Sequence, residues 1–298
     1  MNNLSRVVKH HVCVCVCVVC SVDSDTVREF HLAVMRLDGR KVLCLLRNAD
    51  SLSDTVNSRD HLLRTAAMLI ARRPPSDCRC RSHVRRSMLD ILFEAGAQLD
   101  LVDSAGNTAL MYAVMSSSAD IVDWLLEAGA DPRRANYIGV TPLWQSVFDM
   151  TSRRKHDQWP IIRRLLMTNC AVDHKCRGPL LFAYGTEYVY CYEEPVSALD
   201  VAVDCGCQST ARLLVGAGCS CSTSLMMSSM TTTEHDGTAS WLDELLAESR
   251  SLQQLCRLAI HRSVGPRLET VVQSLCLPVQ LKAFLLLDNI PEPSHCTN

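Results

Sequence analysis

A repeat of about 33 residues is the feature that most constrains what this chain can fold into. Three residue types recur at this offset in two consecutive stretches: Gly106 and Gly139, Thr108 and Thr141, and Leu110 and Leu143. Each glycine predicts a tight turn in which φ is positive, and each threonine stands at the start of a predicted helix. A second helix is predicted by the apolar stripe of Ile121, Val122, Leu125 and Leu126, with Gly129 as its stop. One such unit cannot bury its apolar face alone, so we expect neighbouring units to stack.

The stretch 103–173 resembles the ankyrin-repeat family, because several positions coincide at the ankyrin period. Looser copies lie upstream. Phe30–Ala33 and Val42–Leu46 fit the two helices of a first repeat, whereas His61–Ile70 and Met88–Leu92 fit those of a second. The resemblance implies an all-α solenoid of about five ankyrin repeats over residues 24–221, two of them with insertions. His31 occupies the histidine position of the repeat pattern, and we interpret it as a packed structural side chain.

Two insertions interrupt this pattern. The first, TSRRKHDQWP from Thr151, separates the helices of the repeat that starts at Asn136. The second, from Cys176 to Glu194, holds four of the six tyrosines. Tyrosine-rich loops are favoured contact surfaces, because the ring offers area with few rotatable bonds. The alternative is that this loop folds onto the stack and buries its own rings.

An arginine-rich stretch, 71–86, also contains Pro74 and Pro75, which break a helix. We interpret it as a solvated insertion loop, with a docking patch for an acidic peptide as the alternative.

The ankyrin resemblance implies that hairpin tips and first helices form a concave face that binds a protein substrate. The residues that we predict to contact this substrate are Arg133, Arg134, Tyr137, Trp144, Tyr184 and Tyr188. For Trp144 the alternative is ordinary packing between repeats.

Charge and composition exclude several other classes of protein. A formal net charge of -2 over 298 residues argues against a general binder of nucleic acid or of membrane surfaces. No window approaches the roughly 18 apolar residues of a membrane span. The 17 cysteines are spread through helical stripes, so we expect reduced thiols in a reducing compartment, the cytoplasm or also the nucleus. We predict no metal, no cofactor and no catalytic residue, since no motif of hydrolases, phosphate-binding loops or zinc proteases is present.

Three segments lie outside the predicted repeats and the predicted C-terminal helices. Residues 1–23 contain VCVCVCVVC, which we interpret as a low-complexity extension. A signal peptide and a metal site are weaker alternatives, because no Ala-x-Ala site follows and alternating thiols do not have zinc-ligand spacing. Residues 222–240 are rich in Ser, Thr and Met and predict a flexible linker, and residues 291–298 form a tail.

Residues 241–290 predict a short first helix at Trp241 and then three amphipathic helices. The longest stripe comprises Leu252, Leu255, Cys256, Ala259 and Ile260 at i, i+3, i+4, i+7 and i+8. Gly265-Pro266 ends this helix, and Leu277-Pro278 separates the next two. Such a small core commonly needs a partner in order to be stable.

This segment resembles the SOCS box, the three-helix module that binds elongin and cullin. The Leu and the Cys four residues later are Leu252 and Cys256 here, and the resemblance implies that the whole stripe binds elongin C. The cullin-binding text is matched by Leu277, Pro278, Leu281 and Phe284, but its first proline is replaced by Cys276. That departure puts the strength of cullin binding or the choice of cullin in doubt.

Ankyrin repeats followed by a SOCS box resemble the ankyrin-repeat and SOCS-box family. The resemblance implies a non-catalytic adaptor that holds elongin B, elongin C and cullin-5 with its RING protein at one end and a protein substrate at the other. The alternative is an ankyrin scaffold whose C-terminal helices only cap the stack. A third class, an enzyme, has no support from the motifs.

Overall fold

The computed structural model describes residues 24–49, 51–73, 79–152, 156–168, 170–176, 195–219, 252–264 and 268–290. The predicted linker at 222–240, the helix expected at Trp241 and the extension at 1–23 lie outside these residues. The described part is mostly helical, which confirms the expected fold class.

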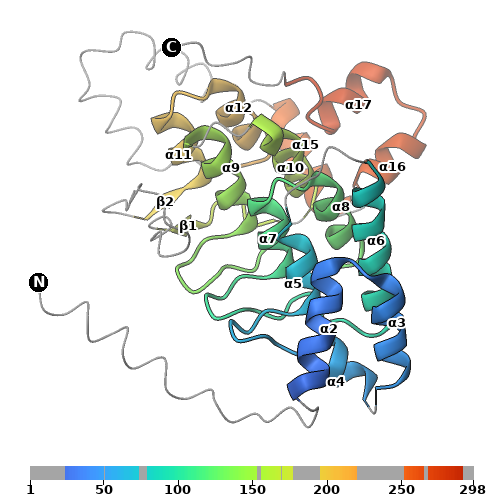
Figure 1. Ribbon diagram of the computed structural model, residues 1–298. Coiled ribbons are helices and arrows are strands. Elements are labelled where there is room, and N and C mark those ends of the chain that lie inside the picture. Colours follow the sequence, from blue (N-terminus) through green and yellow to red (C-terminus); the bar gives the residue numbers. More distant parts are fainter. Residues whose placement is uncertain are drawn as a thin grey trace, which may run out of the picture.

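Helix pairs follow one another along a single stack (Figure 1). The bounds of the five pairs are α2 Ser24–Arg36 with α3 Gly39–Arg47, α5 Ala66–Ala71 with α6 Arg79–Glu94, α7 Ala109–Met115 with α8 Ala119–Glu127, α9 Pro142–Ser152 with α10 Trp159–Leu166, and α11 Ala198–Asp204 with α12 Gln208–Gly216. The short α4 Leu52–Val56 joins the first pair to the second, and a single 3-10 turn, His156–Gln158, precedes α10. First helices pack on first helices, as α5 does on α7 and α7 on α9.

Ser or Thr side chains begin most of the first helices. Thr108 Oγ1 accepts from the Met111 amide at 3.3 Å, and Thr141 Oγ1 accepts from the Trp144 amide at 3.3 Å. Ser197 does the same for α11. Such caps are worth about 1 kcal/mol each. The threonines that recur in the sequence therefore mark where successive first helices begin.

Glycines at the hairpin turns have the predicted left-handed backbone, with φ +83° at Gly106 and +85° at Gly139. Backbone bonds also join successive hairpins: the Ser104 amide donates to Leu62 O at 3.0 Å, and the Tyr137 amide donates to Ala105 O at 3.1 Å. At Gly106 a Cβ would lie 2.6 Å from the Tyr137 nitrogen, so only glycine lets these two turns approach.

The core is one continuous apolar layer between the helices of the stack. His31 is buried, and its Nε2 lies 3.2 Å from both the carbonyl and the hydroxyl oxygens of Ser58. The predicted packing of His31 is therefore confirmed.

The structure corrects two details of the second repeat. Its first helix does not run over His61–Ile70 but begins at Ala66, because the Asp60 carboxylate accepts from the Leu62 and Arg64 amides and holds residues 60–64 in a turn. The arginine-rich stretch is also not a solvated loop throughout. Residues 79–86 belong to α6, and Arg85 is buried with its Nη2 2.9 Å from Ser118 Oγ.

A two-stranded antiparallel sheet closes the base of the tyrosine-rich insertion, pairing β1 Lys175–Cys176 with β2 Val196–Ser197. The sequence pattern did not predict this pairing. Residues 177–194, which include most of the insertion, lie outside the described residues.

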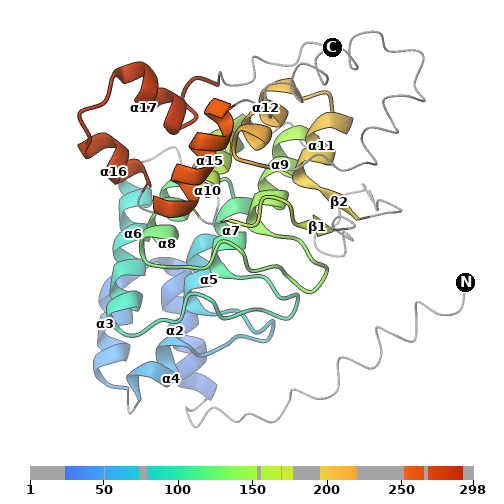
Figure 2. The same cartoon turned by 180° about the vertical axis from the view of Figure 1, so that it is seen from behind.

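The C-terminal unit consists of α15 Leu252–Val264, α16 Leu268–Ser274 and α17 Val279–Leu285. It lies at the end of the stack opposite to α2 (Figures 1 and 2). Its buried apolar side chains are Leu268, Val272, Leu285, Leu286 and Leu287.

Candidate functional site

The outer face of α15 carries an apolar stripe that stays exposed beside the described residues of the stack. Leu255 is 54% exposed and Ile260 is 37% exposed, and Cys256 and Ala259 are also exposed. We call these four residues the outer stripe. Leu252 lies in the first turn of the same helix, and the structure describes its backbone alone.

The opposite face of α15 docks on the last repeat through Arg257, which is only 3% exposed. Its Nη2 donates to Gly216 O at 2.7 Å and its Nη1 donates to Phe284 O at 3.1 Å, so one guanidinium joins α12, α15 and α17. The same group lies over the Phe284 ring, 4.6 Å from its centroid. Burial lowers the pKa of Arg257 to about 10, which still leaves it charged at neutral pH.

Two glycines let α15 come close to the end of α12. A Cβ at Gly216 would lie 2.7 Å from Arg257 Nη2, and one at Gly218 would lie 2.7 Å from Leu258 Cδ2. His261, one turn after Arg257, lies with its Nε2 2.6 Å from Leu285 O. The inner face of α15 is thus fixed by specific contacts, which leaves the outer stripe turned away from the stack.

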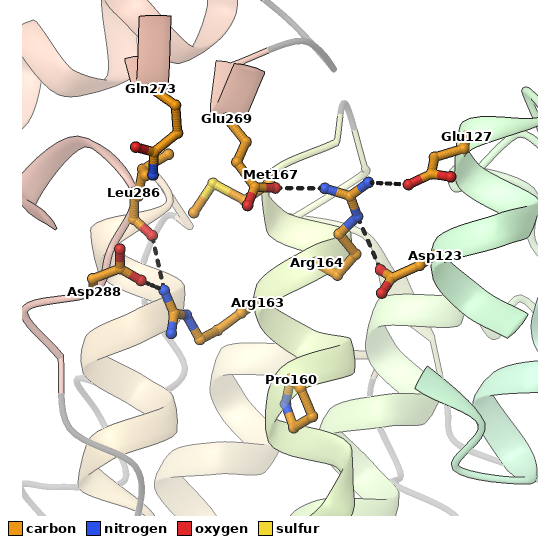
Figure 3. A pocket seen from close by; sticks show the side chains of 10 residues that line it. All are labelled: Asp123, Glu127, Pro160, Arg163, Arg164, Met167, Glu269, Gln273, Leu286 and Asp288. Atoms are coloured by element: carbon orange, nitrogen blue, oxygen red, sulfur yellow. Dashed lines mark hydrogen bonds and ion pairs between the residues drawn. The ribbon is translucent and has the colours of Figure 1, made fainter. Parts of the chain in front are cut away.

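A second set of contacts joins the stack to the C-terminal unit through α10 (Figure 3). Arg164 bridges α8 and α16, with its Nε 3.0 Å from Asp123 Oδ1 and its Nη1 2.7 Å from Glu269 Oε2. Arg163 forms an ion pair with Asp288, and its Nη2 donates to Leu286 O at 3.2 Å. These groups line a cavity of about 470 Å³ between α10 and the C-terminal unit.

Charge in this cavity is partly balanced. Burial raises the pKa of Asp123, and Arg164 opposes that rise. Because both arginines are partly exposed, each pair contributes modestly, but together they orient α16 and α17 on the stack.

The predicted cullin-binding residues lie just before α17 and along it. Pro278 is its N-cap residue and is exposed, and Leu281 is 42% exposed. Leu277 and Phe284 are half-buried, and the Phe284 ring is covered by Arg257. Val279, which the sequence pattern did not single out, is the most exposed large apolar residue in this segment.

The predicted substrate contacts separate into three groups: exposed residues of one hairpin, residues outside the described part of the chain, and the buried Trp144. Arg133, Arg134 and Tyr137 lie exposed on the hairpin between α8 and α9, with Tyr137 72% exposed. Tyr184 and Tyr188 lie outside the described residues.

Trp144 is buried, and this corrects its prediction as a surface contact. Its ring stacks on Phe148 with centroids 5.2 Å apart, and its Nε1 donates to Val196 O at 3.1 Å. The side chain therefore holds β2 against α9, which is the packing role given as the alternative.

Sequence reasoning missed the residues that join the C-terminal unit to the stack. These are Arg163, Arg164, Arg257, Glu269 and Asp288. Arg257 had one usable signal, since it lies within α15 on the face away from the apolar stripe. No group of three metal-binding side chains occurs among the residues that the structure describes. Over the same residues, no helix combines the length and the apolar character of a membrane span.

Comparison with known families identifies both parts of the chain. A model of the SOCS box matches residues 248–286, which include α15, α16 and α17. A model of ankyrin repeats in three copies matches residues 30–136, and the helix pairs α9–α10 and α11–α12 follow that match. No curated protein matches the chain. With ankyrin repeats followed by a C-terminal SOCS box, the chain matches the ankyrin-repeat and SOCS-box family.

Proposed function

We propose that this protein is the substrate-recognition subunit of an elongin B/C–cullin-5–RING ubiquitin ligase. Its ankyrin repeats and SOCS box suggest the more general role of a substrate-recognition adaptor of elongin–cullin ligases. Both kinds of domain are typical of non-catalytic adaptor and scaffold proteins. In this proposal the protein acts in the cytoplasm, with the nucleus as an additional place of action.

The observation that carries the proposal is the outer stripe. An amphipathic helix that leaves a continuous apolar row in water is suited to the groove of another protein. Complete burial of a leucine is worth roughly 1.5–3 kcal/mol, so covering the exposed half of Leu255 is worth about 1 kcal/mol. Ile260 adds a similar amount, and the small Cys256 and Ala259 allow a close approach of the two helices.

The docked inner face makes this binding compatible with the intact stack. Arg257 and Leu258 contact α12 from the side of α15 that faces the repeats, so elongin C can bind the other side without displacing the helix. The exposed Leu281 and Pro278 are offered to cullin-5 in the same way.

The stack supplies the substrate site in this proposal. Arg133, Arg134 and Tyr137 present two guanidinium groups and an aromatic ring on one hairpin, which are residue types enriched at protein interfaces. The work of the chain is positional, because holding a substrate lysine beside the loaded conjugating enzyme raises its effective concentration.

Co-purification with elongin B and C tests the proposal. Leu255→Asp with Ile260→Asp places two charges on the outer stripe, and recovery of elongin should fall by more than about tenfold. The matched control is Leu43→Asp with Leu52→Asp, two leucines of similar exposure on α3 and α4 at the other end of the stack. Equal recovery from both variants would discard the ligase role.

A non-ligase scaffold whose C-terminal helices only cap the stack is the second candidate, and the contacts of Arg257, Arg163 and Arg164 with both parts favour it. Removal of residues 241–298 should then destabilise the repeats, and elongin would not be recovered with the intact chain.

A further inference from the structure

A second cavity, of about 580 Å³, lies at the first repeat beside α2. Helix α2 is far from the C-terminal unit along the stack (Figures 1 and 2). One wall is a face of α2, and the other is the turn at 58–64 together with Leu69 of α5. Its volume falls within the range of about 300–1,000 Å³ that is typical of ligand sites. We call it the α2 cleft.

The walls of the α2 cleft are apolar. Val27, Leu32 and Met35 line the cleft from α2, and Leu32 and Met35, one turn apart, are 37% and 42% exposed. His31 forms the floor beside Ser58. Burial lowers the pKa of His31, so this floor is uncharged at neutral pH.

The rim of the α2 cleft is positively charged. Three arginines and one carboxylate line it, and the carboxylate, Asp60, is held by Arg64 with its Oδ2 2.8 Å from Nε and 2.6 Å from Nη2. Arg28 and Arg59 are exposed, and among the described residues neither pairs with a carboxylate. The two acidic residues on α2, Asp25 and Glu29, do not line the cleft, and Glu29 is paired with Lys41.

We infer that the α2 cleft binds a short partner segment in which large apolar side chains stand beside carboxylates. The apolar residues occupy the space between Leu32, Met35 and Leu69, and the carboxylates pair with Arg28 and Arg59. Arginine is suited to this role because its planar group binds a carboxylate through two parallel hydrogen bonds. The inference deepens the proposed function, on which it rests, by assigning a chemistry to the substrate segment.

The probe is a random dodecapeptide library displayed on phage and selected on the full-length protein. Enriched peptides should contain at least one large apolar residue and an excess of Asp and Glu. Synthetic copies of the enriched peptides are then titrated by fluorescence anisotropy. Their affinity should fall with added salt, because exposed ion pairs are screened.

Two variants separate the cleft from other surfaces. Arg59→Glu reverses the charge of the rim, and Leu32→Glu places a charge on the wall; each should weaken binding by about tenfold or more. Both side chains are exposed enough to be replaced without loss of the core. The control is Leu43→Glu on α3, at a leucine of similar exposure, which should leave the affinity unchanged.

Enrichment of basic or uncharged peptides, or equal affinities in all variants, would overturn the inference. If peptides bound only after removal of residues 1–23, the cleft would belong to the protein's own N-terminal segment, which also overturns it. Elongin recovery from the Arg59→Glu and Leu32→Glu variants is measured in parallel. If the library yields no acidic peptides while the intact protein still recovers elongin, the inference about the cleft fails alone. If the intact protein recovers no elongin, the ligase proposal fails.

Discussion

Arg257 is predicted to be the main attachment of the SOCS box to the ankyrin stack. Replacing it with methionine keeps much of the side-chain volume but removes the donors to Gly216 O and Phe284 O. A hydrogen bond from a charged donor contributes about 1.5–3 kcal/mol. Phe284 O keeps the Leu287 amide as a donor at 3.4 Å, so its loss is the smaller of the two. The release of a buried guanidinium into water offsets part of this loss. We therefore expect Arg257→Met to destabilise the docked α15 by about 2–4 kcal/mol.

Native-state hydrogen exchange is the assay, because it reports opening of α15 separately from unfolding of the repeats. A loss of about 2–4 kcal/mol corresponds to exchange about 30- to 900-fold faster at the amides of α15. Amides of α7 and α9 in the middle of the stack should change much less. The control is Arg40→Met, at an exposed arginine on α3. If the two variants gave the same protection in α15, the reasoning about Arg257 would be refuted.

Three further predictions follow from local geometry. Gly218→Ala should lower the free energy of unfolding in urea more than Gly206→Ala does, because both glycines have a positive φ but only Gly218 would place its Cβ against Leu258. The excess should be about 1–2 kcal/mol, and adding Leu258→Ala should remove it. Burial lowers the pKa of His31 below 6.5, so unfolding takes up a proton and the stability of the first repeat should fall as the pH drops through about 6.5. This fall between about pH 7.5 and pH 5.5 should be smaller in His31→Gln, and an unchanged slope would argue against a buried neutral ring. Leu281→Asp should abolish recovery of cullin-5 while elongin B and C remain bound, whereas joint loss of all three would mean that α17 also serves the elongin contact.

The repeat architecture was predictable from the sequence because the same residue types recur at an offset of about 33 residues. Gly106 and Gly139 mark turns that need a positive φ, and Thr108 and Thr141 mark helix starts, so local chemistry and global fold agree. The position of α15 was predictable for the same reason, since its apolar spacing matches a helix.

Contacts between elements were not predictable in the same way. Arg163 and Arg164 read as ordinary charges at the end of a helix, yet they bind residues more than a hundred positions away. For Trp144 the sequence left a substrate contact and packing between repeats open, and the Val196 carbonyl, as acceptor of its indole N–H, decides for packing. The orientation of a helix on its neighbour depends on which long side chains find partners, and spacing alone does not contain that information.

The central claim is that elongin C covers the outer stripe of α15, and Cys256 reports on it without any substitution. Cys256 lies exposed on α15, Cys44 lies exposed on α3 and Cys205 lies exposed after α11. The measurement is the rate of iodoacetamide alkylation at each thiol, read by mass spectrometry, with and without purified elongin B and C. The account predicts that elongin slows alkylation of Cys256 by about tenfold or more while Cys44 and Cys205 react as before. Unchanged alkylation of Cys256 in saturating elongin would contradict it.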